Sequence, residues 1–248
     1  MAQLSFLHLF ITFSFISGVL SDSFTLTNNC AYTVWPGVLS NAGSTILSAT
    51  GFSLQKGESK TLSTPSGWAG RFWGRTICKQ DSSGKFSCVT GDCGSGTIEC
   101  AGGGPTRPFT LAEFKLDGAD VPDFYDVSLV DGYNLPMLVA PRGGSGNCVI
   151  TGCSVDLNKV CPSDLRLLGE DGRETVACQS PCDAFGDPQY CCSGDYGNSN
   201  ACKPSPYSQF FKHACPRARS YAYDDGTATF TCASADYVIA FCPLISIG

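Results

Sequence analysis

The stretch GKFSCVTGDCGSGTIEC, residues 84–100, sets three cysteines among glycine, serine and threonine, and a fourth cysteine precedes it at position 78. Residues 76–101 contain too few large apolar side chains to form a hydrophobic core. Small segments of this kind depend on disulfides for their stability. We therefore expect a loop stapled by disulfides, in which Asp92 accepts hydrogen bonds from backbone amides rather than doing chemistry.

The sixteen cysteines of the 248-residue chain all lie beyond residue 21. Residues 1–21 hold no Asp, Glu, Lys or Arg and have a central apolar run, which predicts a secretory signal peptide cleaved after Ser21. A membrane anchor is the alternative, but no basic cluster follows the run. An even number of cysteines in a secreted chain indicates disulfides rather than metal ligands.

Composition excludes several classes of function. His213 is the only histidine beyond the signal peptide, so a zinc site or a Ser-His-Asp triad would depend on one residue, and we expect no metal and no cofactor. The net charge is −6 and the pI is about 4.8, which argues against nucleic acid and anionic membrane surfaces as partners. A neutral polysaccharide is compatible, and no stable membrane insertion is expected.

Short alternating runs separated by Gly, Pro, Ser and Asn are typical of a β-sandwich or flattened barrel. They occur at residues 24–39, 59–65, 70–78, 108–118, 124–130 and 237–242. Residues 220–232 read as a further hairpin with Asp225-Gly226 at its tip. The prediction is a mainly β fold with an antiparallel core, a disulfide-rich helical lobe and a small β-ribbon loop.

Helix signals concentrate in residues 148–215. Ser205 and Pro206 form a helix start, apolar residues follow at helical spacing, and Pro216 ends the pattern. A shorter helix is expected from Ser163 to Gly169. The predicted domains are the core (22–75, 102–147 and 216–248), the helical lobe (148–215) and the stapled loop (76–101).

The stretch at residues 84–100 resembles the Gly-x-Phe-x-Cys-x-Thr-Gly-Asp-Cys…Gly…Cys motif of the thaumatin-like proteins, or pathogenesis-related group five. Other stretches share the resemblance: NNCAYTVWPG (28–37), GRFWGRTIC (70–78), TLAEF (110–114), DFYDVSLVDGYNLPM (123–137), YCCSGDYG (190–197), YSQFFKHACP (207–216) and YVIAFCP (237–243). The resemblance spans essentially all of residues 22–243 and includes the number and order of the cysteines.

The resemblance implies eight disulfides, a pairing that spacing alone leaves open. The implied pairs are Cys30–Cys242, Cys78–Cys88, Cys93–Cys100, Cys148–Cys232, Cys153–Cys215, Cys161–Cys178, Cys182–Cys191 and Cys192–Cys202. It also implies a cleft between core and lobe, lined by one arginine and four acids: Arg71, Glu113, Asp126, Asp131 and Asp224. We expect the protein to be a monomer.

Each of these five residues also has a plainer interpretation. Asp131-Gly132 is a turn pair, and it breaks the alternation of the strand before it. Asp126 fits a solvent-facing strand position, Glu113 could pair with Lys115 on its strand, and Arg71 suits a salt bridge. Arg71 also shares a strand face with Trp73 and Arg75. Asp123 has no implied role and is expected in a loop.

Three functions are open at this point. The first is a secreted, antifungal plant defence protein that binds β-1,3-glucan in the acidic cleft, with Tyr133, Tyr221 or Tyr223 stacking on the sugar. The second is a weak endo-β-1,3-glucanase, with Glu113 as proton donor and Asp126 as its partner. The third is a non-catalytic structural, fruit or stress protein.

Two departures from the family pattern bear on these functions. Arg217 and Arg219 stand where relatives usually carry an acid and an aromatic residue, so they could neutralise part of the cleft. The tail after Pro243 is short and apolar, which favours the extracellular space over the vacuole.

Overall fold

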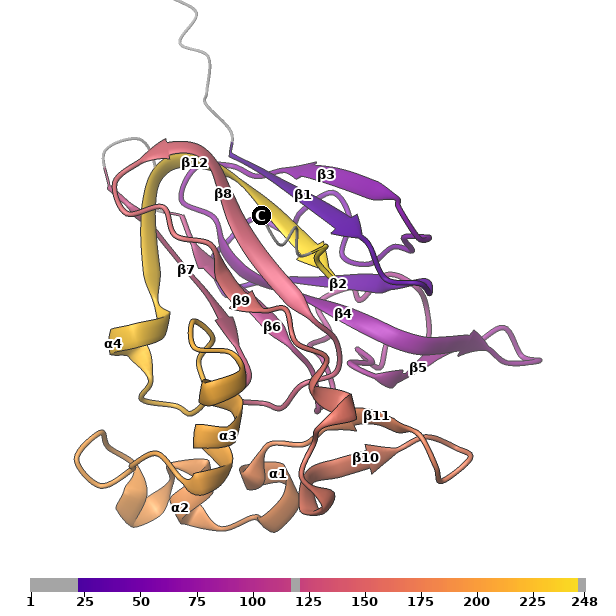
Figure 1. Ribbon diagram of the computed structural model, residues 1–248. Helices are drawn as coiled ribbons and strands as arrows, with labels where there is room; N and C mark the ends of the chain where they lie inside the picture. Colours follow the sequence, from indigo (N-terminus) through magenta and orange to yellow (C-terminus); the bar gives the residue numbers. More distant parts are fainter. Residues whose placement is uncertain (1–21, 117–120, 245–248) are drawn as a thin grey trace, which may run out of the picture.

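The computed structural model describes residues 22–116 and 121–244. The predicted signal peptide and nearly all of the tail after Pro243 lie outside these ranges. The described chain is mainly β, as predicted (Figure 1). Its strands are β1 (Ser23–Asn28), β2 (Trp35–Ser40), β3 (Ser59–Ser63), β4 (Ala69–Gln80), β5 (Phe86–Thr90), β6 (Leu111–Lys115), β7 (Asp123–Ser128), β8 (Met137–Ser145), β9 (Thr151–Cys153), β10 (Arg166–Leu168), β11 (Thr175–Cys178) and β12 (Phe230–Phe241).

Ten of these strands form one curled sheet in which β2, β4, β6, β7, β12, β1 and β3 are successive neighbours. The pairs are antiparallel except for β1 with β12. Alternate residues of the strands are apolar, so one face of the sheet is apolar and is buried. The sheet curls around this face, which encloses an aromatic core. Phe24 lies at its centre, with ring centroids 4.6 Å from Phe114 and 4.8 Å from Phe72.

The helices gather below the sheet in Figure 1, next to the small sheet of β10 and β11. They are α1 (Pro181–Phe185), α2 (Pro188–Cys191), α3 (Pro206–Ala214) and α4 (Asp225–Ala228), with 3₁₀ turns at Leu157–Lys159, Ser163–Leu165 and Gly194–Tyr196. The predicted start of α3 is confirmed: the Ser205 side chain accepts a hydrogen bond from the Ser208 amide in a capping box.

Two local predictions are wrong. The expected hairpin at residues 220–232 is instead a turn followed by α4, and β12 starts only at Phe230. The Asp-Gly pair signals a chain reversal but does not distinguish a hairpin tip from a helix start. The expected helix after Ser163 is one 3₁₀ turn, and the chain then enters β10 because Leu167 pairs with Ala177 of β11.

All sixteen cysteines form disulfides, in the same eight pairs that the resemblance implies. Cys30–Cys242 joins the ends of β1 and β12, two strands that are also paired. Among the described residues, no helix is long and apolar enough to cross a membrane.

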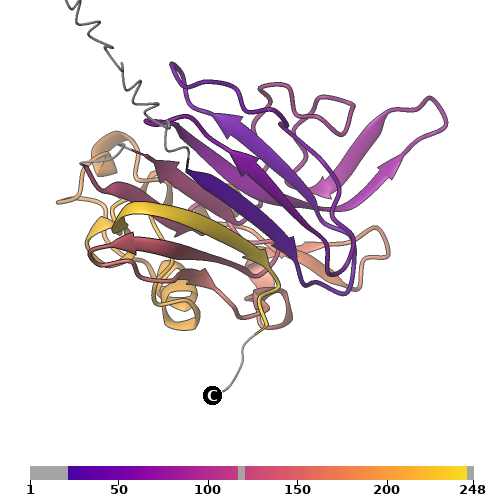
Figure 2. The same cartoon turned by 90° about the horizontal axis from the view of Figure 1, so that it is seen from above.

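The predicted stapled loop includes the ribbon of β4 and β5, which extends away from the rest of the molecule (Figure 2). Asp92 accepts hydrogen bonds from the Cys88 and Gly94 amides, which confirms its structural role. Trp73 and Arg75 are fully buried, so they do not offer an exposed ring beside a charge. The Trp73 indole donates to the Gly91 carbonyl, and the ring packs beneath the loop.

Candidate functional site

Three of the predicted site residues form a row across adjacent strands. Arg71 of β4 lies opposite Glu113 of β6, and Glu113 lies opposite Asp126 of β7. Directly opposed residues carry their side chains on the same face of a sheet. Strand alternation in the sequence indicates which face each residue takes, and the strand order β4–β6–β7 makes the three residues neighbours. We call Arg71, Glu113 and Asp126 the cross-strand row.

Asp126 is almost buried in this row, with 7 % of the residue exposed. Burial and the neighbouring Glu113 raise the pKa of Asp126 to about 7, although Arg219 opposes that rise. The Arg219 Nη1 lies 3.6 Å from Asp126 Oδ2, and its Nη2 lies 2.9 Å from Asp225 Oδ1. Of the two arginines expected to neutralise part of the cleft, Arg219 is therefore the one that lies beside these acids.

Arg219 is held in place by its backbone. Its amide donates to the Val127 carbonyl and its carbonyl accepts from the Leu129 amide, so it extends the edge of β7. Its Nη2 also donates to the Ala222 carbonyl. Arg217, in contrast, donates from its Nη1 to the Ile150 carbonyl.

Buried polar atoms without hydrogen-bond partners concentrate in this region. Among the described residues, five buried side-chain nitrogen or oxygen atoms lack a partner. Three of them are Arg71 Nε, Asp126 Oδ1 and Arg219 Nε. Because an unpaired buried polar atom is costly, such a cluster indicates a place where a ligand or water supplies the missing bonds.

Asp131 lies in a separate polar hollow, although it follows β7 closely in the sequence. The strand ends at Ser128, as predicted, and the turn is completed by Gly132 with φ +95°. A side chain on Gly132 would collide with Pro108 Cβ at 2.6 Å. Asp131 Oδ1 forms an ion pair with Arg107 Nε at 2.6 Å. Arg107 Nη1 also lies 3.4 Å from Oδ1 of Asp183 in α1.

Asp224 is a buried structural carboxylate in the segment between α3 and β12. Its Oδ2 accepts hydrogen bonds from Lys212 Nζ and from the Ser220 amide and hydroxyl, and its Oδ1 accepts from Thr227. Burial opposes ionisation of Asp224, but these hydrogen bonds outweigh it and lower the pKa. With its oxygens engaged by the protein, Asp224 has little capacity left for a ligand.

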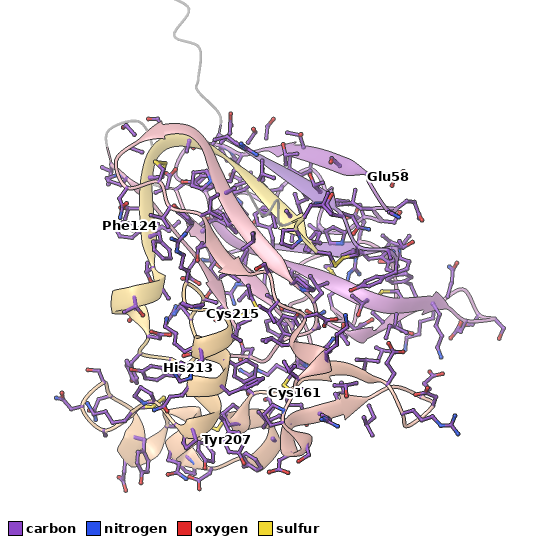
Figure 3. All side chains as sticks on the ribbon, in the orientation of Figure 1. Glu58, Phe124, Cys161, Tyr207, His213 and Cys215 are labelled. Atoms are coloured by element: carbon purple, nitrogen blue, oxygen red, sulfur yellow. A yellow bond between two sulfur atoms is a disulfide. The ribbon has the colours of Figure 1, made fainter. Side chains whose placement is uncertain are left out.

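The aromatic residues near the acids differ from the expected set. Tyr133 is fully buried and donates to the Val155 carbonyl, so it cannot stack on a sugar. Tyr221 lines the hollow of Asp131. Phe124, which sequence reasoning passed over, is 42 % exposed on the same strand as Asp126 (Figure 3). Phe124 alternates with Tyr125 along the strand, and this pattern could have indicated that Phe124 lies on the face opposite the core.

Sequence reasoning also missed the partners of the acids. Arg107, Asp183 and Lys212 are distant in sequence from the acids they accompany, and no local pattern marks them. Asp123 is another correction: it starts β7 instead of lying in a loop, is buried, and accepts a hydrogen bond from the Tyr237 hydroxyl at 2.8 Å.

Comparisons with known proteins agree with the fold and the motifs. The thaumatin family profile matches residues 28–243. A pathogenesis-related thaumatin-like protein 3.5 from Cryptomeria japonica is 55 % identical over 220 residues, 89 % of each chain. The chain thus belongs to the thaumatin family. Its many disulfides fit the oxidising extracellular environment.

Two further comparisons concern a longer relative and a solved structure of the same fold. A PR5-like receptor kinase from Arabidopsis thaliana is 52 % identical over 245 residues, 97 % of this chain, but the chain spans only 37 % of that relative's length. A laminaripentaose-producing β-1,3-glucanase, solved in complex with laminaritetraose, shares the fold with a TM-score of 0.58 and 12 % identity, over 90 % of this chain and 99 % of the other.

Proposed function

We propose that the protein is a secreted plant defence protein that binds β-1,3-glucan of fungal walls at the cross-strand row. The observation that carries the proposal is the cluster of unpartnered atoms: Arg71 Nε, Asp126 Oδ1 and Arg219 Nε. The hydroxyls of a sugar both donate and accept hydrogen bonds, so one ligand can satisfy a carboxylate and two guanidinium groups together.

Charge around the row also favours a neutral ligand. Arg219 lies against Asp126 and Asp225, and Arg71 stands opposite Glu113. Opposite charges therefore alternate over the site. A strongly charged partner would be repelled at some of these positions, whereas a polysaccharide would gain hydrogen bonds at each. Phe124 lies on the same side of the sheet as Asp126, and its exposed ring can stack against the apolar surface of a sugar.

The binding test is depletion of pure protein from solution by insoluble β-1,3-glucan. We expect Arg71→Ala and Glu113→Ala each to weaken binding by about tenfold or more, because each loses a charge-assisted hydrogen bond of about 1.5–3 kcal/mol. The matched control is Glu170→Ala, which removes an exposed acid paired with Lys79 on the surface. Unchanged binding by both row variants would contradict the proposal.

Weak hydrolysis of the same glucan is the second candidate, favoured by the raised pKa of Asp126 beside Glu113. The roles first assigned from the sequence are exchanged here: Asp126 is the proton donor and Glu113 the nucleophile or base. Directly opposed strand positions hold Cβ atoms about 5 Å apart. From such positions the two side chains can reach the carboxyl separation of about 5–5.5 Å found in retaining glycosidases.

Hydrolysis is tested by the release of reducing ends from the glucan. We expect release at pH 5, a decline as the pH rises through about 7 where Asp126 loses its proton, and no release by Asp126→Asn. A proton donor must be protonated to act, which sets the direction of the decline. Binding at pH 5 without release would exclude hydrolysis and leave the binding function intact.

A further inference from the structure

The helical lobe carries a groove that the cross-strand row does not use. One hollow contains Asp131, Tyr190 and Tyr221, and a second hollow contains Tyr190 and Tyr196. The two share four lining residues: Gln189, Tyr190, Lys203 and Ser205. They therefore adjoin each other along these residues: the inner hollow reaches the turn after β7 at Asp131, and the outer hollow reaches Tyr196. We call the two adjoining hollows the tyrosine groove.

The walls of the tyrosine groove are fixed before any ligand arrives. The disulfides Cys182–Cys191 and Cys192–Cys202 tie its segments together, and their cysteines line the first hollow. The Tyr190 ring is supported from behind by Phe185 and Tyr207, with centroids 5.6 and 5.9 Å away. Figure 3 places Tyr207 among the helices at the end of the molecule away from Phe124. A preformed groove loses little conformational entropy on binding.

The lining indicates the chemical class of the ligand. Tyrosines line both hollows, and Gln189 and Lys203 bring further hydrogen-bonding groups. The Ser205 hydroxyl, which also lines both hollows, is already engaged in the capping box of α3. Apolar rings with a few convergent polar groups suit a ligand that has both apolar faces and hydroxyls. In the outer hollow Lys203 is the one charged lining residue, so a polyanion would find little to bind. A chain of neutral sugar units fits both features.

The groove and the cross-strand row meet at residues 219–222. Arg219 contacts Asp126 on one side, while Ser220, Tyr221 and Ala222 line the groove on the other. We propose that the tyrosine groove binds the continuation of a β-1,3-glucan chain whose other end occupies the row. This inference rests on the proposed function, and it adds that the protein selects long chains over short ones. Tyr196 is then a specificity residue for chain length.

The test compares two soluble probes, a β-1,3-glucan trisaccharide and a β-1,3-glucan hexasaccharide, by titration calorimetry. The wild-type protein should bind the hexasaccharide more tightly. Tyr196→Ala should weaken hexasaccharide binding roughly tenfold, the loss of one aromatic contact, and leave trisaccharide binding unchanged. The matched control is Tyr32→Ala, which removes a tyrosine that is 48 % exposed and lies beside Cys242, outside the groove.

The outcomes separate the two proposals. If the trisaccharide binds but the hexasaccharide binds no more tightly, or if Tyr196→Ala binds it as wild type does, the groove inference is wrong and the row remains. If wild type binds neither probe, both proposals are wrong. Because Tyr196 is 39 % exposed at the end of a 3₁₀ turn, its replacement leaves the core intact, and an unchanged circular dichroism spectrum verifies this.

Discussion

Replacing Asp126 with asparagine should stabilise the protein by about 4 kcal/mol at pH 8 and by far less at pH 4. The pKa of this carboxyl is about 7 in the folded protein and 3.8 in the unfolded chain. Each unit of difference corresponds to about 1.4 kcal/mol. Such a large gain from removing a charge is expected because Asp126 is buried beside another acid.

The direction of the pH dependence follows from proton binding. A carboxyl with a raised pKa holds its proton more tightly in the folded state, so folding becomes less favourable as the pH rises from about 4 through 7. Asparagine carries no charge at any pH and removes this loss. The variant and wild type should therefore have similar stability at pH 4 and diverge up to pH 7.

The measurement is guanidinium denaturation of the oxidised protein, followed by circular dichroism at several pH values. Asp225→Asn is the matched control, because Asp225 also pairs with Arg219 but has a 65 % exposed side chain. It should show no comparable difference between pH 4 and pH 8. A wild-type stability that is flat from pH 4 to pH 7 would contradict the buried, repelled state of Asp126.

Asp224→Ala should have the opposite effect and lower the free energy of unfolding by about 3 kcal/mol at neutral pH. The change leaves the Lys212 ammonium, whose side chain is only 26 % exposed, without its carboxylate. Breaking one partner out of a buried ion pair costs about 3–5 kcal/mol. The partial exposure of Lys212 places the expected loss at the lower end.

The adjacent residue provides the control for this prediction. Asp225→Ala removes an acid of the same type one position further on, but an exposed one, and should cost less than about 1 kcal/mol. Denaturation midpoints of the two variants give the comparison. Equal losses would show that Asp224 is not the organising residue of the segment before β12, and would return it to the candidate ligand-binding residues.

Several local features of the fold could be predicted from the sequence. Alternation located β1 to β4, β6, β7 and the second half of β12, and the Ser205-Pro206 pair located the start of α3, because both depend on residues close in the chain. Alternation did not locate β8 to β11. The end of β7 before Asp131 was likewise evident from the break in alternation and the Asp-Gly turn. These signals failed at residues 220–232, where a turn residue pair was compatible with two different structures.

The positions of the acids relative to one another could not be predicted from local sequence patterns. Alternation assigns Glu113 and Asp126 to a face, but only the strand order places them opposite each other with Arg71. Similarly, Asp131 pairs with Arg107 and Asp224 with Lys212 through contacts between segments that no sequence period connects. The four acids implied by the resemblance therefore have three different environments.

The sequence by itself determined the family, the strand-rich class and the cysteine content of this protein, since these are properties of local pattern and motif. Only the tertiary structure decided which acids have their oxygens engaged by hydrogen bonds from the protein. The Asp224 carboxylate accepts hydrogen bonds on both oxygens, whereas the Asp126 carboxyl group is buried and its Oδ1 has no hydrogen-bond partner. Burial and the neighbouring charges set the free energy of each acid, and both depend on residues brought together from distant parts of the chain.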